Sequence, residues 1–380
     1  MSLREQIAAV ADTVVVKVGT RVLTDARGAL DLDRVAAVAE QVASATDGGR
    51  RVALVSSGAV GAGIGRLGLP QRPIDLARLQ AAAAIGQSRL IEVYNQALEA
   101  HGHHAAQVLL TADDLNDRRR YLNTRNTLLE LFRFGAVPIV NENDTVRVDE
   151  LQRSVGDNDR LAAVVTNLLR APLLVLLSDV DGLYDGDPDD AGSKVLPVVE
   201  SINDDVLGLT RATAAMGPRL STGGMASKLA AAQMATGAGE NVVVANGRRP
   251  GVLSDILAGA DVGTLFVAQQ ASVSSRKRWI GRTAQPVGRL TLDAGAARAI
   301  TTGGNSLLPV GVVAVAGEFG KGDVVSLVTA GGDELARGLT NYDHKQVAAI
   351  RGRSTEDIPG ILGHRPYLEV VHRDNLALVD

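Results

Sequence analysis

Two short clusters of carboxylate and carboxamide side chains are the residues best suited to chemistry in this chain. Asn141-Glu142-Asn143-Asp144 directly follows the apolar run 137–140, and Gly156-Asp157-Asn158-Asp159 comes after a short polar stretch. Burying such groups costs free energy unless cations lie against them. Ordinary polar turns would account for one cluster. Two in succession favour an ionic binding site at the end of a strand, where open α/β sheets hold their ligands.

Two lysines near glycines supply the opposite charge. Lys17 interrupts an apolar run just before Gly19, so its ammonium group either reaches solvent at a strand end or faces an anion. Lys228 closes the run Thr222-Gly223-Gly224-Met225-Ala226-Ser227-Lys228, whose free backbone amides could cradle a phosphate. The spacing is not that of a Walker A loop, and a plain glycine-rich helix start is the alternative.

A third loop is built from small residues. Ser56-Ser57-Gly58-Ala59 follows the apolar run 51–55. Small side chains let a ligand approach the backbone, and the N–H groups at a helix start favour phosphate or carboxylate. A simple helix cap is the alternative interpretation.

Three other patterns are rejected as sites. The glycines of 63–68 match GxGxxG, but they begin well after the preceding strand and run into Leu69-Pro70, so the dinucleotide-binding context is missing. The acidic run 185–190 lacks the glycine and glutamate of a calcium loop. The histidines at 101, 103 and 104 are crowded at a predicted helix end and are better explained as solvated residues.

Composition restricts the classes of function. The 380 residues are 46% hydrophobic and 22% charged, which predicts well-packed domains. A net charge of −4 argues against bulk electrostatic binding of nucleic acid. Disulfides, thiolate zinc sites and cysteine nucleophiles are excluded because the chain has no cysteine. The N-terminus does not resemble a signal peptide and no apolar run is long enough to cross a bilayer, so we expect a cytoplasmic protein without a membrane partner.

Short apolar runs rich in β-branched residues alternate with longer helical patterns over the first two thirds of the chain. Runs that are apolar throughout are typical of strands covered on both faces. The alternation predicts an α/β fold, a three-layer αβα sandwich with a mainly parallel sheet. The predicted strands are 13–18, 51–55, 105–109, 137–140, 173–177 and 241–244, and the predicted helices include 31–45, 74–100, 112–134, 158–169 and 229–236.

The pattern changes after about residue 269. A polar, basic stretch is followed by short strands separated by glycine-rich turns, at 289–292, 310–316 and 323–327. We therefore predict a first domain over 1–270 that carries the site, a linker over 271–285 and a small, β-barrel-like second domain over 286–380.

The loops described above, taken in order, resemble those of the amino acid kinase family, and the resemblance covers essentially the whole chain. The NEND and GDND pair and the additional C-terminal domain are similar to the branch that phosphorylates glutamate. The tail resembles a PUA domain, a small β-barrel. The matching segments are VVVKVGT at 14–20, VSSGAVGAG at 55–63, AAIGQSRL at 83–90, VPIVNENDTV at 137–146, VGDNDRLAA at 155–163, LLSDVDGLYDGDP at 176–188, STGGMASKLAAA at 221–232, GTLF at 263–266 and RKRWI at 276–280.

The resemblance implies transfer of the ATP γ-phosphoryl group, with Mg²⁺, to the side-chain carboxylate of L-glutamate, the first step of proline biosynthesis. An ionised carboxylate is already a nucleophile at neutral pH, so no general base is required. What the reaction needs is neutralisation of charge on the transferring group.

The resemblance also implies roles for individual residues. Lys17 and Lys228 would stabilise the transferring phosphoryl group, and Asp159 would hold both lysines. The glutamate site would consist of Ser57, Asp144 and Asn158, with Asp157 orienting their loop. ATP would be bound by Lys17, Ser178, Asp179, Thr222, Gly223, Gly224, Met225, Ala226, Ser227 and Lys228. No protein ligand to Mg²⁺ is predicted.

Other functions and partners remain open at this point. An RNA-binding or RNA-modifying protein is the alternative of a different class, based on the basic stretch and the PUA-like tail, although aromatic residues are only 3% of the chain. A related kinase acting on another carboxylate is the third reading. We further expect a homo-oligomer and consider proline a candidate feedback inhibitor, since an end product resembling the substrate would compete near 156–159.

Overall fold

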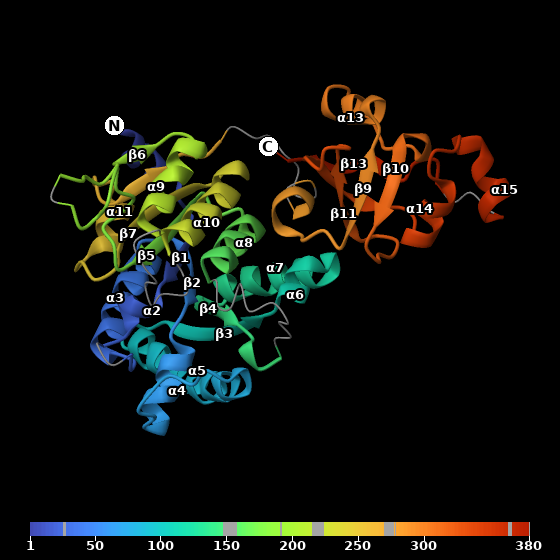
Figure 1. The fold of residues 1–380 in the computed structure, drawn as a ribbon. Helices are drawn as coiled ribbons and strands as arrows, with labels where there is room; N and C mark the ends of the chain where they lie inside the picture. The colour runs from blue at the N-terminus through green and yellow to red at the C-terminus, as the bar shows by residue number, and fades with distance from the viewer. Residues whose placement is uncertain are drawn as a thin grey trace. The chain divides into compact units, whose positions relative to one another are not determined.

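The computed structural model describes residues 1–25, 28–146, 158–190, 192–214, 224–269, 277, 279–363 and 367–379. The chain divides into two units, Met1–Ala271 and Ser272–Asp380 (Figure 1). None of the helices in the described residues is long and apolar enough to span a membrane.

The first unit is built on an eight-stranded sheet with the order β3-β4-β2-β1-β5-β7-β8-β6. All neighbouring strands are parallel except β7 and β8. The prediction of a mainly parallel sheet is therefore confirmed. The strands are β1 Thr13–Val18, β2 Arg51–Ser56, β3 His104–Leu110, β4 Ala136–Glu142, β5 Leu173–Ser178, β6 Val198–Val199, β7 Asn241–Asn246 and β8 Thr264–Phe266.

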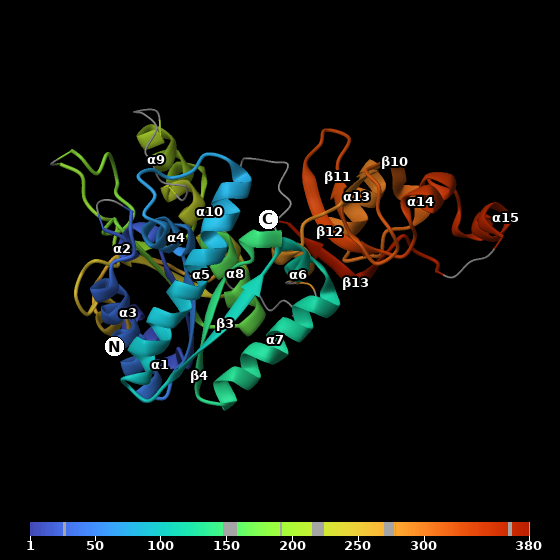
Figure 2. The same ribbon diagram turned by 90° about the horizontal axis from the view of Figure 1, so that it is seen from below.

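Helices cover both faces of this sheet, which gives the predicted three layers. α3, α5 and α11 pack against one face, and α7, α8 and α10 against the other. Figure 2 shows α3 and α7 on opposite sides of the unit. The helices are α1 Leu3–Val10, α2 Thr20–Leu23, α3 Leu32–Asp47, α4 Ala59–Leu67, α5 Leu76–Glu99, α6 Ala112–Asn116, α7 Arg118–Arg133, α8 Asn158–Leu169, α9 Asp204–Ala214, α10 Met225–Gly237 and α11 Val252–Leu257.

The alternation of side chains along β1 directs one lysine toward the α8 face. Val14, Val16 and Val18 belong to the apolar core shared with α3 and α5. Because successive side chains of a strand point to opposite faces, Lys17 projects to the other side, where α8 begins. This lysine is only 6% exposed although it is charged.

Glycines let α4 and α5 approach each other at backbone distance. A Cβ added to Gly63 of α4 would lie 1.9 Å from the carbonyl oxygen of Ala82, and one added to Gly86 of α5 would lie 1.8 Å from that of Ala59. No larger residue fits at either position. The GxGxxG pattern at 63–68 thus includes a helix-packing glycine, and this contact fixes the position of Gln87 on α5.

Several predicted boundaries need correction, including the strand predicted over 137–140, which extends to Glu142. The helix predicted over 112–134 is two helices, because Asp117 has an extended backbone and its side chain accepts a hydrogen bond from Arg120 N at the start of α7. The helix predicted over 229–236 begins earlier, at Met225. The strand predicted over 310–316 begins at Val312, since Pro309–Gly311 forms a 3₁₀ turn.

The second unit contains a five-stranded sheet with the order β10-β9-β11-β12-β13, in which only β9 and β11 are parallel neighbours. A π-helix, η2 Trp279–Thr283, packs against β12 and β13, and Trp279 is 2% exposed. The remaining elements are β9 Gly288–Leu292, β10 Val312–Ala316, β11 Val324–Val328, β12 Glu334–Thr340, β13 Val371–Leu378, α13 Ala294–Thr301, α14 His344–Ile350 and α15 Ile358–Leu362.

Candidate active site

The carboxyl ends of four parallel strands meet at one edge of the first sheet. In register, Val18 of β1 lies beside Ser56 of β2 and Leu177 of β5. The loops that follow are tied to these neighbours, because Gly19 N donates to Leu177 O at 3.0 Å and Ser57 N donates to Val18 O at 3.2 Å. The loops after β1, β2, β4 and β5 therefore open at the same edge, as the sequence predicts.

One buried carboxylate contacts both lysines singled out in the sequence. Lys17 Nζ lies 2.5 Å from Asp159 Oδ1, and Lys228 Nζ lies 3.5 Å from Asp159 Oδ2. Ser227 Oγ donates to the same Oδ2 at 3.0 Å. Asp159 is fully buried and Lys228 is 4% exposed. Ion pairs this well removed from water form only when the fold holds the partners in place.

The pKa values of Asp159 and Lys228 are both lowered, which favours the charged form of the aspartate and the neutral form of the lysine. Burial alone would raise the pKa of the Asp159 carboxyl, but the nearby ammonium groups of Lys17 and Lys228 outweigh it and hold that pKa below its ordinary value. Burial lowers the pKa of Lys228, and the charge of Asp159 only partly offsets this. The carboxylate is thus firmly ionised, whereas Lys228 loses its proton more easily than a lysine in water.

Two helix starts and one strand end bring these three residues together. Asp159 is the second residue of α8, Lys228 is the fourth residue of α10, and Lys17 is the penultimate residue of β1. α8 and α10 pack side by side (Figure 1). Helix N-termini carry free N–H groups and a positive partial charge, so the edge between them favours an anion.

Asn158 joins the ends of β2 and β4 through its side-chain amide. The two hydrogens of its Nδ2 are shared among three acceptors, Ser57 Oγ at 2.9 Å, Ser56 O at 3.3 Å and Asn141 Oδ1 at 3.0 Å. Asn141 Nδ2 in turn donates to Gln87 Oε1 at 3.0 Å. Of these residues, Ser57 and Asn158 are predicted site residues. Asn141 belongs to the first polar cluster and Gln87 to the AAIGQSRL segment, but neither is singled out by the sequence.

A pocket of about 210 Å³ lies at the other end of this amide chain. Asp144, a predicted site residue, lines it as the first residue of a 3₁₀ turn after β4. Gln87 and Glu142 line it as well, and the remaining lining residues are Ala83, Ala84, Ser88, Gln107, Leu109, Asn143 and Thr145. Asp144 therefore shares a pocket with Gln87, which is joined to Asn158 through Asn141.

Ser178 is the last residue of β5, and Asp179 follows it at the same edge. Ser178 Oγ donates to Asp179 Oδ1 at 3.2 Å, and Arg21 Nη1 lies 2.8 Å from Asp179 Oδ2. Burial would raise the pKa of Asp179, but its hydrogen bond and charge interaction with Arg21 lower it below the ordinary value. Arg21 is a residue of this edge that sequence reasoning missed, although it comes directly after the KVGT motif.

The remaining predicted residues fall into two groups. Gly224 is the residue before α10 and has an extended backbone, and Met225, Ala226 and Ser227 form the first turn of that helix. Asp157, Thr222 and Gly223 lie outside the described residues. Among the described residues, no group of three or more His, Asp or Glu side chains could hold a metal ion.

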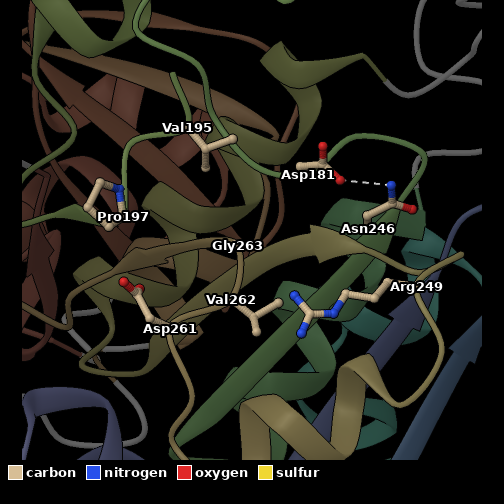
Figure 3. A pocket seen from close by; sticks show the side chains of 8 residues that line it. All are labelled: Asp181, Val195, Pro197, Asn246, Arg249, Asp261, Val262 and Gly263. Atoms are coloured by element: carbon tan, nitrogen blue, oxygen red, sulfur yellow. Dashed lines mark hydrogen bonds between the residues drawn. The ribbon is translucent and has the colours of Figure 1, made fainter. Parts of the chain in front are cut away.

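A second pocket, of about 240 Å³, is lined by residues that include Asp181 of the loop after β5 and Asn246 at the end of β7. Figure 3 shows its lining side chains, which include Arg249. Asn246 Nδ2 donates to Asp181 Oδ1 at 2.9 Å. None of the described residues that line it belongs to the predicted site.

Comparisons with known proteins agree with this architecture. A sequence model of the amino acid kinase family matches residues 12–246, and a model of the PUA domain matches residues 288–362. A glutamate 5-kinase of Rhodopirellula baltica is 49% identical, covering 100% of this chain and 96% of its own. The glutamate 5-kinase of Myxococcus xanthus is 48% identical over 96% of each chain, and that of Caldanaerobacter subterraneus is 45% identical over 97% of this chain and 98% of its own.

Proposed function

The chain belongs to the amino acid kinase family, within its glutamate 5-kinase branch, and we propose that it phosphorylates the side-chain carboxylate of L-glutamate with ATP. The product is an acyl phosphate, L-glutamyl 5-phosphate, and the reaction is the first step of proline biosynthesis. The observation that carries the proposal is the single buried carboxylate of Asp159 in contact with both Lys17 and Lys228.

The chemistry requires charge neutralisation more than proton transfer. A carboxylate oxygen of glutamate attacks the γ-phosphorus of ATP, the bond from that phosphorus to the β,γ-bridging oxygen breaks, and ADP leaves. The nucleophile is ionised at neutral pH because its pKa is near 4, so no base is needed. Negative charge on the attacking, transferring and leaving oxygens must be stabilised by fixed cations.

Lys17 and Lys228 are the catalytic cations in this proposal, and both also bind ATP through its phosphates. Asp159 is a positioning residue whose oxygens hold the two ammonium groups at a fixed separation. Because Asp159 stays ionised next to them, it also offsets the repulsion between the two cations in the absence of nucleotide.

Ser57, Asn158 and Asp144 form the proposed glutamate site. The hydroxyl of Ser57, held by Asn158 Nδ2, suits a carboxylate oxygen. The Asp144 carboxylate suits the α-ammonium group. The proposed role of Asp157 is to orient the loop before α8.

The proposed nucleotide site runs from the end of β5 to the start of α10. Ser178, Asp179 and the loop ending in Lys228 would contact ATP, including Thr222, Gly223, Gly224, Met225, Ala226 and Ser227. The described part of that loop offers backbone amides and an ammonium group, a donor set that suits phosphate oxygens. Mg²⁺ would enter on the ATP phosphates and reduce their charge, since it keeps much of its water shell and takes few protein ligands.

A hydroxamate trap tests reaction and substrate together. The full-length protein, Mg-ATP and hydroxylamine are incubated with a panel of amino acids, and acyl phosphates are captured as coloured hydroxamates. The proposal predicts colour with L-glutamate and none with L-aspartate or N-acetyl-L-glutamate. ATP-dependent hydroxamate from another acid, with none from L-glutamate, would refute it.

We also propose a cytoplasmic homo-oligomer that proline inhibits in competition with glutamate. Proline carries the same α-carboxylate and a secondary ammonium, so it can occupy the part of the pocket that recognises these groups. The test is initial-rate inhibition by proline at varied glutamate, where competition raises KM and leaves kcat unchanged. RNA binding by the PUA domain is a separate question, which filter binding at physiological salt answers.

A further inference from the structure

Backbone groups fix the orientation of the Asn141 and Asn158 amides, and Asn141 in turn fixes that of Gln87. Glu142 N donates to Asn141 Oδ1 at 2.9 Å, so the other atom of the Asn141 amide is the nitrogen. That nitrogen donates to Gln87, which makes the contacting Gln87 atom its oxygen. At the other end Asn158 Nδ2 donates to Ser56 O, which only an N–H group can do.

This polarity leaves one polar atom without a partner at each end of the chain of amides. Within the described part of the protein, Gln87 Nε2 and Asn158 Oδ1 are buried and have no hydrogen-bond partner. Gln87 is 9% exposed and Asn158 is 6% exposed. An unsatisfied buried polar group lowers stability, so a bound molecule is expected to supply a partner at this site.

The two atoms differ in what they require. Gln87 Nε2 can only donate a hydrogen bond, and Asn158 Oδ1 can only accept one. A carboxylate of a bound amino acid supplies the acceptor that Gln87 Nε2 requires.

The surroundings of Gln87 identify which carboxylate it meets. Gln87 and Asp144 line the same pocket, and Asp144 is the proposed partner of the α-ammonium group. The α-carboxylate is bonded to the same carbon as that ammonium group, so it must lie close by. The side-chain carboxylate must instead reach the lysines held by Asp159, the neighbour of Asn158 at the far end of the amide chain.

Building on the proposed function, we propose that Gln87 is a substrate-binding residue, whose Nε2 donates to the α-carboxylate of glutamate. Through Asn141 it also fixes the orientation of Asn158. The side-chain amides of Gln87, Asn141 and Asn158 thereby extend along the bound amino acid. Gln87 selects for a free α-carboxylate at one end, and Asn158 lies next to the catalytic cluster at the other.

The first test is Gln87→Glu in the full-length protein. A glutamate keeps an oxygen to accept from Asn141 Nδ2 and replaces the donating Nε2 with a second acceptor. We expect KM for glutamate to rise about tenfold to a hundredfold, while KM for ATP stays within about twofold. Gln96→Glu is the matched control, because it makes the same charge change at an exposed position of the same helix.

The second test separates binding from a structural effect. 4-Aminobutyrate is glutamate without its α-carboxylate, and its inhibition constant against glutamate can be measured whether or not it is phosphorylated. In Gln87→Met, which keeps the length of the side chain, glutamate should bind about tenfold or more weakly and 4-aminobutyrate with unchanged affinity. Equal weakening of both ligands, or an unchanged KM for glutamate in Gln87→Glu, would overturn the inference.

These results are distinct from failure of the proposed function. If the unmodified protein forms no hydroxamate from glutamate, the proposed function fails. If the unmodified protein is active and both Gln87 variants bind glutamate as it does, only the inference about Gln87 fails. The melting temperature without ligands shows whether each variant is folded.

Discussion

The ammonium nitrogen of Lys17 lies 2.5 Å from Asp159 Oδ1, with the lysine 6% exposed and the aspartate fully buried. The other oxygen of the same carboxylate is shared by Ser227 and Lys228. A strand end and two helix starts that are distant in the chain are therefore joined at one carboxylate. This contact makes the site a single electrostatic unit.

Removing the charge of Asp159 should destabilise the fold. Asp159→Asn leaves two buried ammonium groups facing each other without an anion, so we expect the free energy of unfolding at pH 7 to fall by about 3 kcal/mol or more. Urea unfolding measures this. Glu40→Gln, the loss of one charge on an exposed position of α3, should change stability little. Equal stability of Asp159→Asn and the unmodified protein would contradict the arrangement.

The same carboxylate gives a stability that depends on acid. The pKa of Asp159 is lower in the folded protein than its ordinary value. Its contribution is therefore complete above the ordinary carboxyl pKa and is lost as pH falls through the lower, folded value. Urea unfolding from pH 7 downward should show the difference between the unmodified protein and Asp159→Asn shrinking only in acid. A difference that already vanishes between pH 7 and 5 would show that the folded pKa is not lowered.

As pH rises, kcat/KM for ATP should begin to fall at a lower pH than it would if Lys228 had the pKa of an ordinary lysine. Burial lowers the pKa of Lys228, so its ammonium group is lost at a lower pH than that of free lysine as pH rises. The alkaline limb of kcat/KM for ATP reports this group in the free enzyme. Lys228→Arg should shift the limb to higher pH, because guanidinium does not titrate in this range. The exposed change Lys345→Arg is the control, and a limb that stays in place in Lys228→Arg would exclude Lys228 as its source.

Asp144 should act on the amino acid and not on the nucleotide. Asp144→Ala removes the proposed partner of the α-ammonium group, so KM for glutamate should rise at least tenfold while KM for ATP changes little. Glutarate lacks the ammonium group, and its inhibition constant should be nearly the same in both proteins. A comparable rise in both Michaelis constants would show that Asp144 supports the fold instead of binding glutamate.

Much of the fold could be predicted from the sequence because the apolar runs are short and β-branched. β1 and α8 have the predicted bounds, and the sheet is mainly parallel as expected. The break between α6 and α7 was missed because Asp117 lies within a continuous helical pattern. Its side chain caps the start of α7 and so begins a new helix. β6 and β8, with two and three residues, are too short for a periodic pattern to identify.

The site could be predicted less completely. The two polar clusters and the two lysines are visible as charges at strand and helix ends, so sequence reasoning finds Lys17, Asp159 and Lys228. Gln87 could not be found in this way, because its position depends on the contact of Gly63 and Gly86 between α4 and α5. Arg21 was missed for a similar reason, since its pairing with Asp179 joins loops that follow different strands.

The most direct test of the central claim is a double-mutant cycle on the two lysines, with kcat measured by the hydroxamate assay. Lys17→Ala and Lys228→Ala should each lower kcat about a hundredfold to a thousandfold, with Lys228→Ala changing KM for glutamate little. Both cations act on one phosphoryl group, and one carboxylate holds them both in place. The double variant should therefore be only slightly slower than either single variant. Losses that multiply in the double variant, or a single variant that keeps the full kcat, would contradict the account.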